Sequence, residues 1–300
     1  MRIALFDVDS KIPNLALMRL SRFYVERGDD VEFYLPLAKA SYDKIFASKI
    51  FDYSDGSDLD PNQMVIGGTG FDLKASLPQE VERVPPDYTL YRYPHNIGFT
   101  MRGCRFRCAF CVVPEKEGRP AANNSIEDIW TQRSSDFVVL LDNDFFGGPA
   151  WRERIDEIRR HDLRVSFSQG LNIRIITDEQ AQALAALRFR NLSGKTKQVH
   201  FAWDQWGKGT EKLVDDGFAR VVAAGIQPYQ MMFFVLIGWN TNEEQDLYRI
   251  RKLHDMGCDA FVMPYDRNDP YQKALARWNN RHLWRSVPWP DYRYAVDGPS

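Results

Sequence analysis

Three of the chain's four cysteines crowd into one short segment. Cys104, Cys108 and Cys111 lie within eight positions in the spacing C-x3-C-x2-C. Thiolates this close in sequence can converge on one centre, and soft sulfur ligands suit iron–sulfur clusters or zinc. Three protein ligands fill only three of the four positions that such a centre offers. The spacing therefore predicts a thiolate-bound metal centre that keeps one position open for a substrate or cofactor.

This segment resembles the signature of the radical S-adenosylmethionine (SAM) superfamily, C-x3-C-x-aromatic-C, with Phe110 as the aromatic residue. The preceding residues 98–103 are similar to the strand and turn that lead into this loop in the subgroup related to methylthiotransferases and cobalamin-dependent members. The resemblance implies a [4Fe-4S] cluster whose open iron chelates the amino and carboxylate groups of SAM. Reductive cleavage of SAM, with a reductant such as flavodoxin or ferredoxin, would then give a 5′-deoxyadenosyl radical that abstracts hydrogen from a substrate.

Two simpler interpretations of the same cysteines stay open. One is a structural zinc site in which His95 supplies the fourth ligand, because cysteine-rich loops of this kind often bind zinc. The other is a set of three buried cysteines that bind no metal. The elements that surround the motif decide between these interpretations and the iron–sulfur one.

Composition excludes several classes of protein. A chain of 300 residues can bury a large core in one large domain or two smaller ones. The net charge of −2 gives no overall field that would draw the chain to nucleic acid or a membrane. The longest apolar run, 231–239, is interrupted by Gly238 and is too short to span a bilayer. Acidic residues at positions 7 and 9 precede any signal-peptide segment, so we expect no membrane association.

Cys258 is the remaining cysteine, and we expect it to be a buried structural thiol because it lies beside an apolar strand. One further cysteine supports neither a disulfide framework nor a second cluster. Methylthiotransferases carry three cysteines in their N-terminal module, whereas residues 1–92 here contain none. We therefore expect a single-cluster enzyme in the cytoplasm, where thiols stay reduced.

Residues 1–92 alternate between apolar strands and a helical segment. We expect strands at 3–6, 31–35, 44–51 and 63–66 and a helix at 15–27. This pattern predicts a small Rossmann-like parallel α/β module with any ligand at the carboxyl edge of its sheet. The glycine-rich segment 67–70 has neither a Walker nor a G-x-G-x-x-G pattern, so we expect a tight turn there. Residues 85–87 look like a linker.

This module resembles the cobalamin-binding-like domain that precedes some radical SAM barrels. The turn after its first strand, 7–11, lacks the D-x-H-x-x-G motif whose histidine ligates cobalt. The charged loop 52–60 also offers little apolar surface to a ligand as large as a corrinoid. Cobalamin is therefore the less favoured alternative, and we expect the module to act as a lid or a support.

Strands and helices alternate regularly over residues 93–265. After the lead-in to the cysteines, we expect strands at 137–141, 165–168, 199–203, 230–237 and 260–265. The intervening helices are expected at 150–160, 177–187, 209–225 and 242–256. About six βα units fit a partial (β/α)6 barrel, an open relative of the eight-unit barrel. This context favours the radical SAM interpretation over zinc.

Polar residues follow the last apolar residue of several strands, and these positions line the active-site face of a parallel barrel. The resemblance assigns roles to them by strand order. The methionyl amine of SAM would meet the acidic residues at the end of the second strand, and the methionyl carboxylate would meet the polar residues at the end of the third strand. Later strands would contact the adenine, the ribose or the substrate. The implied cofactor-binding residues are Phe110, Asp142, Asn143, Asp144, Gln169, Arg174, Asp204 and Gly238.

The C-terminal segment 266–300 interleaves aromatic and basic residues. We expect these aromatic side chains to cover the open side of the barrel, because aromatic residues dominate core energetics. The alternative is a surface that binds a nucleic-acid strand through phosphate contacts and base stacking.

Three functions follow from these observations. The favoured one is a radical SAM enzyme acting on a nucleoside, a nucleic acid or a peptide. A cobalamin-dependent radical SAM methyltransferase would be distinguished by a bound corrinoid. A zinc-stabilised binding protein without redox chemistry would be distinguished by its metal content. Neither the substrate nor a catalytic residue that acts on it can be read from the sequence.

Overall fold

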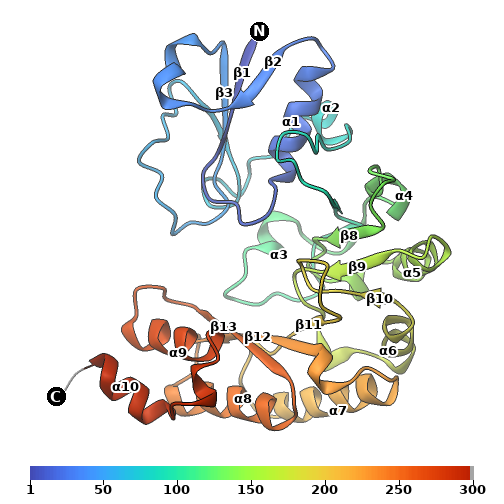
Figure 1. Ribbon diagram of the computed structural model, residues 1–300, viewed down its shortest axis with the longest axis vertical. Helices are drawn as coiled ribbons and strands as arrows, with labels where there is room; N and C mark the ends of the chain where they lie inside the picture. Colours follow the sequence, from blue (N-terminus) through green and yellow to red (C-terminus); the bar gives the residue numbers. More distant parts are fainter. Residues whose placement is uncertain (298–300) are drawn as a thin grey trace.

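The computed structural model describes the backbone of residues 1–297 and the side chains of residues 1–293. Its chain forms a mixed α/β structure built on parallel sheets (Figure 1). The first sheet belongs to the N-terminal module and has the strand order β2-β1-β3-β4. All of its strands are parallel: β1 (Arg2–Asp7), β2 (Asp30–Phe33), β3 (Lys44–Ser48) and β4 (Val65–Gly67). The alternating pattern of residues 1–92 is thereby confirmed.

Helix α1 (Leu15–Val25) packs on this sheet. It begins at Asn14, whose side chain accepts hydrogen bonds from the amides of Ala16 and Leu17 and so caps the first turn. The buried face of the helix meets the completely buried β1 residues Ile3 and Leu5 in one cluster. Short elements complete the module: the 3-10 helix η1 (Pro36–Ser41) and α2 (Gln79–Glu82).

The glycine-rich segment 67–70 forms the expected tight turn. A side chain on Gly68 would lie 2.2 Å from the carbonyl oxygen of Lys49, and one on Gly70 would lie 2.3 Å from the carbonyl carbon of Phe51. Gly68 also has a φ of +98°. Only glycine fits a turn that runs this close to a neighbouring backbone.

The rest of the chain builds a second layer of parallel strands. Two sheets, β10-β9-β8-β5 and β11-β12-β13, are joined by a parallel bridge between Leu171 and Phe201. Six of the strands therefore follow one another as β5-β8-β9-β11-β12-β13, and β10 is an extra strand beside β9. Their bounds are β5 (Asn96–Gly98), β8 (Phe137–Leu140), β9 (Arg164–Phe167), β10 (Arg188–Phe189), β11 (Val199–Ala202), β12 (Met231–Ile237) and β13 (Asp259–Pro264).

Helices connect these strands and cover one side of the layer (Figure 1). Capping boxes begin α6 at Thr177 and α8 at Asn242, in agreement with the sequence. No helix in the part of the chain that the structure describes is long and apolar enough to cross a membrane. The helices are α3 (Val113–Lys116), α4 (Ile126–Ile129), α5 (Trp151–Arg160), α6 (Asp178–Ala185), α7 (Thr210–Ala223), α8 (Glu243–Asp255), α9 (Pro270–Asn280) and α10 (Trp289–Asp297), with short 3-10 turns η2 (Phe145–Gly147), η3 (Ile173–Ile175), η4 (Pro228–Gln230) and η5 (Leu283–Arg285).

The segment expected to be a linker is packed instead of free. Asp87 is buried and accepts a hydrogen bond of 2.7 Å from the hydroxyl of Ser21 on α1. The neighbouring Tyr88 lies in a core cluster that joins Met18 of α1 to Phe137 of β8. This apolar contact fixes the module against the second layer, because its side chains would otherwise face water.

The aromatic C-terminal segment packs on the core. Trp278 of α9 and Trp289 of α10 are buried in the main hydrophobic cluster, and Tyr271, Trp284 and Tyr292 pack against it. The indole nitrogen of Trp289 donates to Glu243 at 2.7 Å. Trp278 and Trp289 are thus core residues, as the packing interpretation expects, and the other three rings are partly buried against them. Residues 298–300 of the expected segment lie outside the described residues.

Candidate metal and cofactor site

The cysteine loop runs from β6 (Met101–Arg102) to α3, and β6 pairs with the short antiparallel strand β7 (Ala121–Ala122). Cys104, Cys108 and Cys111 are free thiols, and each is half-buried. The amide of Cys111 donates to the carbonyl of Cys108 at 3.0 Å, which turns the loop. Gly103 has a φ of +82°, and a side chain there would lie 2.3 Å from the carbonyl oxygen of Arg119. The entry to the loop therefore requires glycine.

Asp144, at the end of β8, clamps this loop. Its buried carboxylate accepts from the Nε of Arg105 at 2.7 Å, from the Nη2 at 2.8 Å and from the backbone amide at 3.1 Å. A fork of two parallel charge-assisted bonds fixes both position and orientation. The residue thus holds the backbone between the first two cysteines.

Glu117 makes a second anchor. Its Oε2 accepts from the amide of Gly103 at 2.9 Å and from the side chain of Asn143 at 3.0 Å. Its Oε1 lies 2.8 Å from the guanidinium of Arg102. Two residues that follow β8 are therefore tied to the cysteine loop. Asn143 is connected through Glu117 to Gly103, just before Cys104, and Asp144 binds Arg105, just after it.

Asp142 faces inward from the same strand end and is buried. Its Oδ1 accepts from the amides of Thr100 and Met101 at 2.7 and 3.1 Å, and its Oδ2 accepts from the Thr100 hydroxyl at 2.5 Å. Burial raises the pKa of Asp142 to about 6, although these donors act in the opposite direction. Asp142 therefore fixes the turn that follows β5.

Replacing Asp142 with asparagine should change how stability depends on pH. The raised pKa means that the folded state holds the proton more tightly than the unfolded state, whose value is near 3.8. Wild-type stability relative to Asp142→Asn should therefore fall as pH rises from about 4 to about 6, by about 3 kcal/mol. Urea unfolding of both proteins across this range measures the difference, and a difference that does not vary with pH would contradict the assignment.

A second group of side chains surrounds Cys108. The side-chain amide of Gln205 donates to the Cys108 sulfur at 3.2 Å, and its oxygen accepts from Arg174 at 2.7 Å. Arg174 is also held by Asn172 at 3.3 Å, and its guanidinium lies 5.6 Å from the ring centre of Phe106. These contacts orient the guanidinium toward the cysteine loop.

Burial raises the pKa of all three motif thiols, that of Cys104 to about 11. The charge of Asp204 raises the pKa of Cys108 and Cys111 further, whereas the charge of Arg174 lowers that of Cys108. Metal binding deprotonates thiols, so loading this loop with metal would release protons. Cys258 is buried as expected, and burial raises its pKa to about 12.

Asp204 follows β11 and accepts a hydrogen bond of 3.1 Å from the amide of Leu236 on β12. Burial raises its pKa to about 6, and the charges of Arg249 and Arg174 partly offset this effect. This carboxyl group therefore lies within the electrostatic reach of both Arg174 and two of the thiols.

Gly238 ends β12 with a φ of +77°, and a side chain on it would collide with Gln272. The next residue, Trp239, packs edge-on against Phe110 at 6.0 Å and contacts Tyr265 at 4.6 Å between ring centres. Phe110 thus joins the cysteine loop to the ends of β12 and β13.

The structure brings most of the candidate residues to this loop, with two exceptions. Gln169 is exposed, and its side-chain amide donates to the hydroxyl of its neighbour Ser168 at 3.5 Å. His95 precedes β5, at the opposite end of the strand from the cysteines, and packs on Tyr93 and Phe137. Among the described side chains, residues 1–293, no three His, Cys, Asp or Glu are gathered to hold one metal ion, and this includes the three motif cysteines. His95 is therefore not placed beside the cysteines as a fourth ligand.

Sequence reasoning missed three residues of this site: Arg105, Glu117 and Gln205. Arg105 lies inside the cysteine motif itself, and a basic residue between thiols could have signalled an acidic partner. Glu117 and Gln205 carry no such signal, because their contacts depend on how distant segments meet. Comparison with models of protein families found no matching family, and comparison with curated proteins found no similar sequence.

Proposed function

We propose that this protein is a radical SAM enzyme with a partial (β/α)6 barrel. The observation that carries the proposal is the surroundings of Cys108, where a free thiol lies beside Arg174, Gln205 and Asp204 at the carboxyl ends of parallel strands. A structural metal site has no need of an oriented guanidinium and a half-buried carboxyl group next to its ligands. A site that binds a zwitterionic cofactor has a use for both.

The chemistry of the donor set suits a [4Fe-4S] cluster, and the three thiols would have to turn toward one centre to hold it. Cys104, Cys108 and Cys111 are unpaired thiols on one anchored loop, and thiolates are the ligands that such clusters take. Three ligands would leave one iron for SAM. When bound, the cluster and SAM would supply a 5′-deoxyadenosyl radical for hydrogen abstraction.

The chain's own residues would orient SAM. Arg174 is held through its Nε and Nη1 by Asn172 and Gln205, so its Nη2 remains to meet the SAM carboxylate. Asp142 and Asp144 each use three of the four acceptor positions of their carboxylates on the loop. Among the strand-end residues 142–144, the side-chain oxygen (Oδ1) of Asn143 is therefore our candidate acceptor for the SAM amine.

Other groups would bind the rest of the cofactor. Asp204 would meet the ribose or the substrate from the end of β11. The backbone at Phe110 and Gly238 would contact the adenine, since Trp239 joins these two segments. Gln205 would hold the Cys108 thiolate by its N–H donor at 3.2 Å. Such bonds stabilise a thiolate over a thiol.

The N-terminal module would cover the proposed reaction site. Lys116 of α3 donates to the carbonyls of Leu73 and Ala75 at 3.2 and 3.3 Å. The Arg267 guanidinium lies over the ring of Tyr53, 3.9 Å from its centre. The module thus contacts both the cysteine loop and the segment after β13. Covering the strand ends would keep water and oxygen from a radical.

Anaerobic reconstitution with iron and sulfide tests the proposal. We expect about four iron atoms and four sulfides per chain and release of 5′-deoxyadenosine when SAM and a reductant are added. A flavodoxin or ferredoxin of the cytoplasm would supply the electron in the cell. Stoichiometric zinc with no uptake of iron would overturn the proposal. Retention of hydroxocobalamin after desalting would instead favour the cobalamin-dependent methyltransferase.

A further inference from the structure

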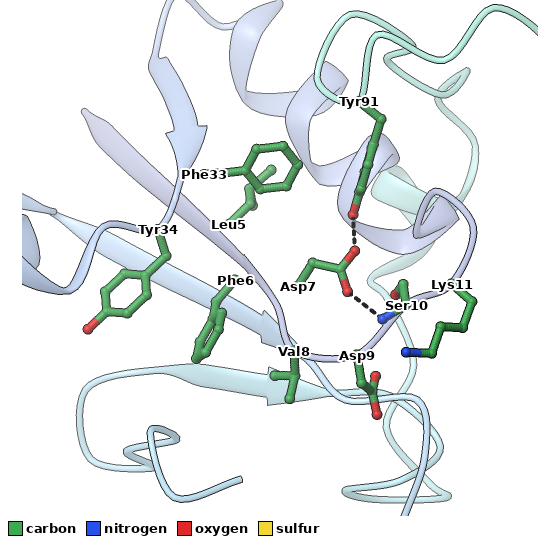
Figure 2. Close-up of a pocket in the computed structure, with 10 residues that line it drawn as sticks. All are labelled: Leu5, Phe6, Asp7, Val8, Asp9, Ser10, Lys11, Phe33, Tyr34 and Tyr91. Carbon is green, nitrogen blue, oxygen red and sulfur yellow. Dashed lines mark hydrogen bonds between the residues drawn. The ribbon is translucent and has the colours of Figure 1, made fainter. Parts of the chain in front are cut away.

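A cavity of about 490 Å³ opens at the carboxyl ends of β1 and β2 in the N-terminal module. Ligands of open parallel sheets bind at this edge, and the volume falls within the usual range for small-molecule sites. Figure 2 shows Asp7, Asp9, Ser10 and Lys11 along the turn after β1, which forms the polar side of the cavity, with Tyr91 reaching Asp7. The lining residues are Leu5, Phe6, Asp7, Val8, Asp9, Ser10, Lys11, Phe33, Tyr34 and Tyr91.

Four aromatic rings line the cavity as two pairs, one on each face of the sheet. Phe6 and Tyr34 lie 5.1 Å apart between ring centres, and Phe33 meets Tyr91 edge-on at the same distance. Phe33 is 37% exposed although it ends a strand, so part of its ring is free to contact a ligand. A planar heterocycle can pack on such rings by offset or edge contacts.

Asp7 provides the hydrogen-bond acceptors of the polar side. Its Oδ2 accepts from the Tyr91 hydroxyl at 2.6 Å, and its Oδ1 accepts from the amide of Ser10 at 3.1 Å. A carboxylate oxygen can accept two hydrogen bonds, so each oxygen retains one free position. Two adjacent acceptors of this kind match the two hydroxyls of a ribose.

Lys11 provides the positive charge. It is exposed, and among the described side chains of residues 1–293 its ammonium has no hydrogen-bond or ion-pair partner. The second acid of the cavity, Asp9, accepts from the amides of Ile50 and Phe51 at 2.7 and 2.8 Å and so holds the loops together. The free charge of the lysine is therefore available to an anionic group such as a phosphate.

We propose that this cavity binds a nucleoside monophosphate. The base lies against Phe33, which shares a face of the sheet with Leu5 and contacts Tyr91 beside Asp7. The ribose hydroxyls donate to Asp7, and the phosphate meets Lys11. A dinucleotide is disfavoured because the loop 7–11 contains no glycine that would let the backbone approach a pyrophosphate. The proposal does not depend on the radical SAM assignment, since no cysteine lines the cavity.

Isothermal titration of the full-length chain with AMP, adenosine and 2′-deoxy-AMP tests this assignment. Lys11→Ala should weaken AMP binding about 10-fold and leave adenosine binding unchanged. The wild type should bind AMP about 10-fold more tightly than 2′-deoxy-AMP, and Asp7→Asn should reduce this preference. Lys74→Ala, an exposed lysine of the same module outside the cavity, is the matched control.

Lys11 is exposed, so its replacement should not unfold the module. Circular dichroism checks that Lys11→Ala, Asp7→Asn and Lys74→Ala are folded. Replacing the three motif cysteines with alanine should leave AMP binding intact, which separates this site from the proposed cluster. Absence of AMP binding at millimolar concentration would overturn the proposal. So would equal losses of affinity in Lys11→Ala and Lys74→Ala.

Discussion

Replacing Cys104, Cys108 or Cys111 with alanine should each abolish SAM cleavage. Removing one ligand would open a second iron of the proposed cluster, and the remaining two thiolates would not keep it bound in one orientation. The three positions lie on one loop that is anchored by Asp144 and Glu117, so the loop should survive each substitution. Iron content and 5′-deoxyadenosine release, measured anaerobically on each variant, give the result.

Cys258→Ala is the matched control for these variants. This thiol is 5% exposed and packs in the main core cluster rather than on the loop. Its replacement should leave both iron content and SAM cleavage at the wild-type level, with a stability cost of about 1 kcal/mol. A loss of iron in Cys258→Ala equal to that in the motif variants would contradict the assignment, and so would full activity in any motif variant.

Hydrophobic pattern explains why the main strands and helices could be predicted. Strands such as Phe137–Leu140 are unbroken apolar runs because helices or neighbouring segments cover both of their faces. Helices α6 and α8 carry capping residues that mark where they begin. The strand β10, Arg188–Phe189, was missed because two residues carry no periodicity.

The roles of the strand-end acids could not be predicted in the same way. Asp142 and Asp144 were expected to meet SAM, and the expectation that acids lie at this strand end is sound. Their contacts are with Thr100, 42 positions away, and with Arg105, 39 positions away. A hydrogen bond between such distant residues depends on how two strand ends approach, which no local pattern in the sequence encodes.

The strand ends that are proposed to bind the cofactor depend on a completely buried ion pair. Arg249 and Asp246 on α8 lie 2.6 Å apart with both side chains inaccessible to solvent. The guanidinium donates to the carbonyls of Trp203 and Leu236 at 2.8 Å each, at the ends of β11 and β12. The carboxylate accepts from the amide of Gly238 at 3.1 Å. The pair thus fixes the strand ends that carry Asp204 and Gly238.

Arg249→Met should therefore destabilise the protein by about 3–5 kcal/mol, because it leaves the Asp246 charge buried without its partner. Arg251→Met on the same helix is the matched control: Arg251 is exposed, and its replacement should change the free energy of unfolding by less than about 0.5 kcal/mol. Adding Asp246→Asn to Arg249→Met removes the unpaired charge and should restore part of the loss. Urea unfolding of the four proteins measures these differences. A cost for Arg249→Met no larger than that for Arg251→Met would show that the strand ends keep their places without the pair.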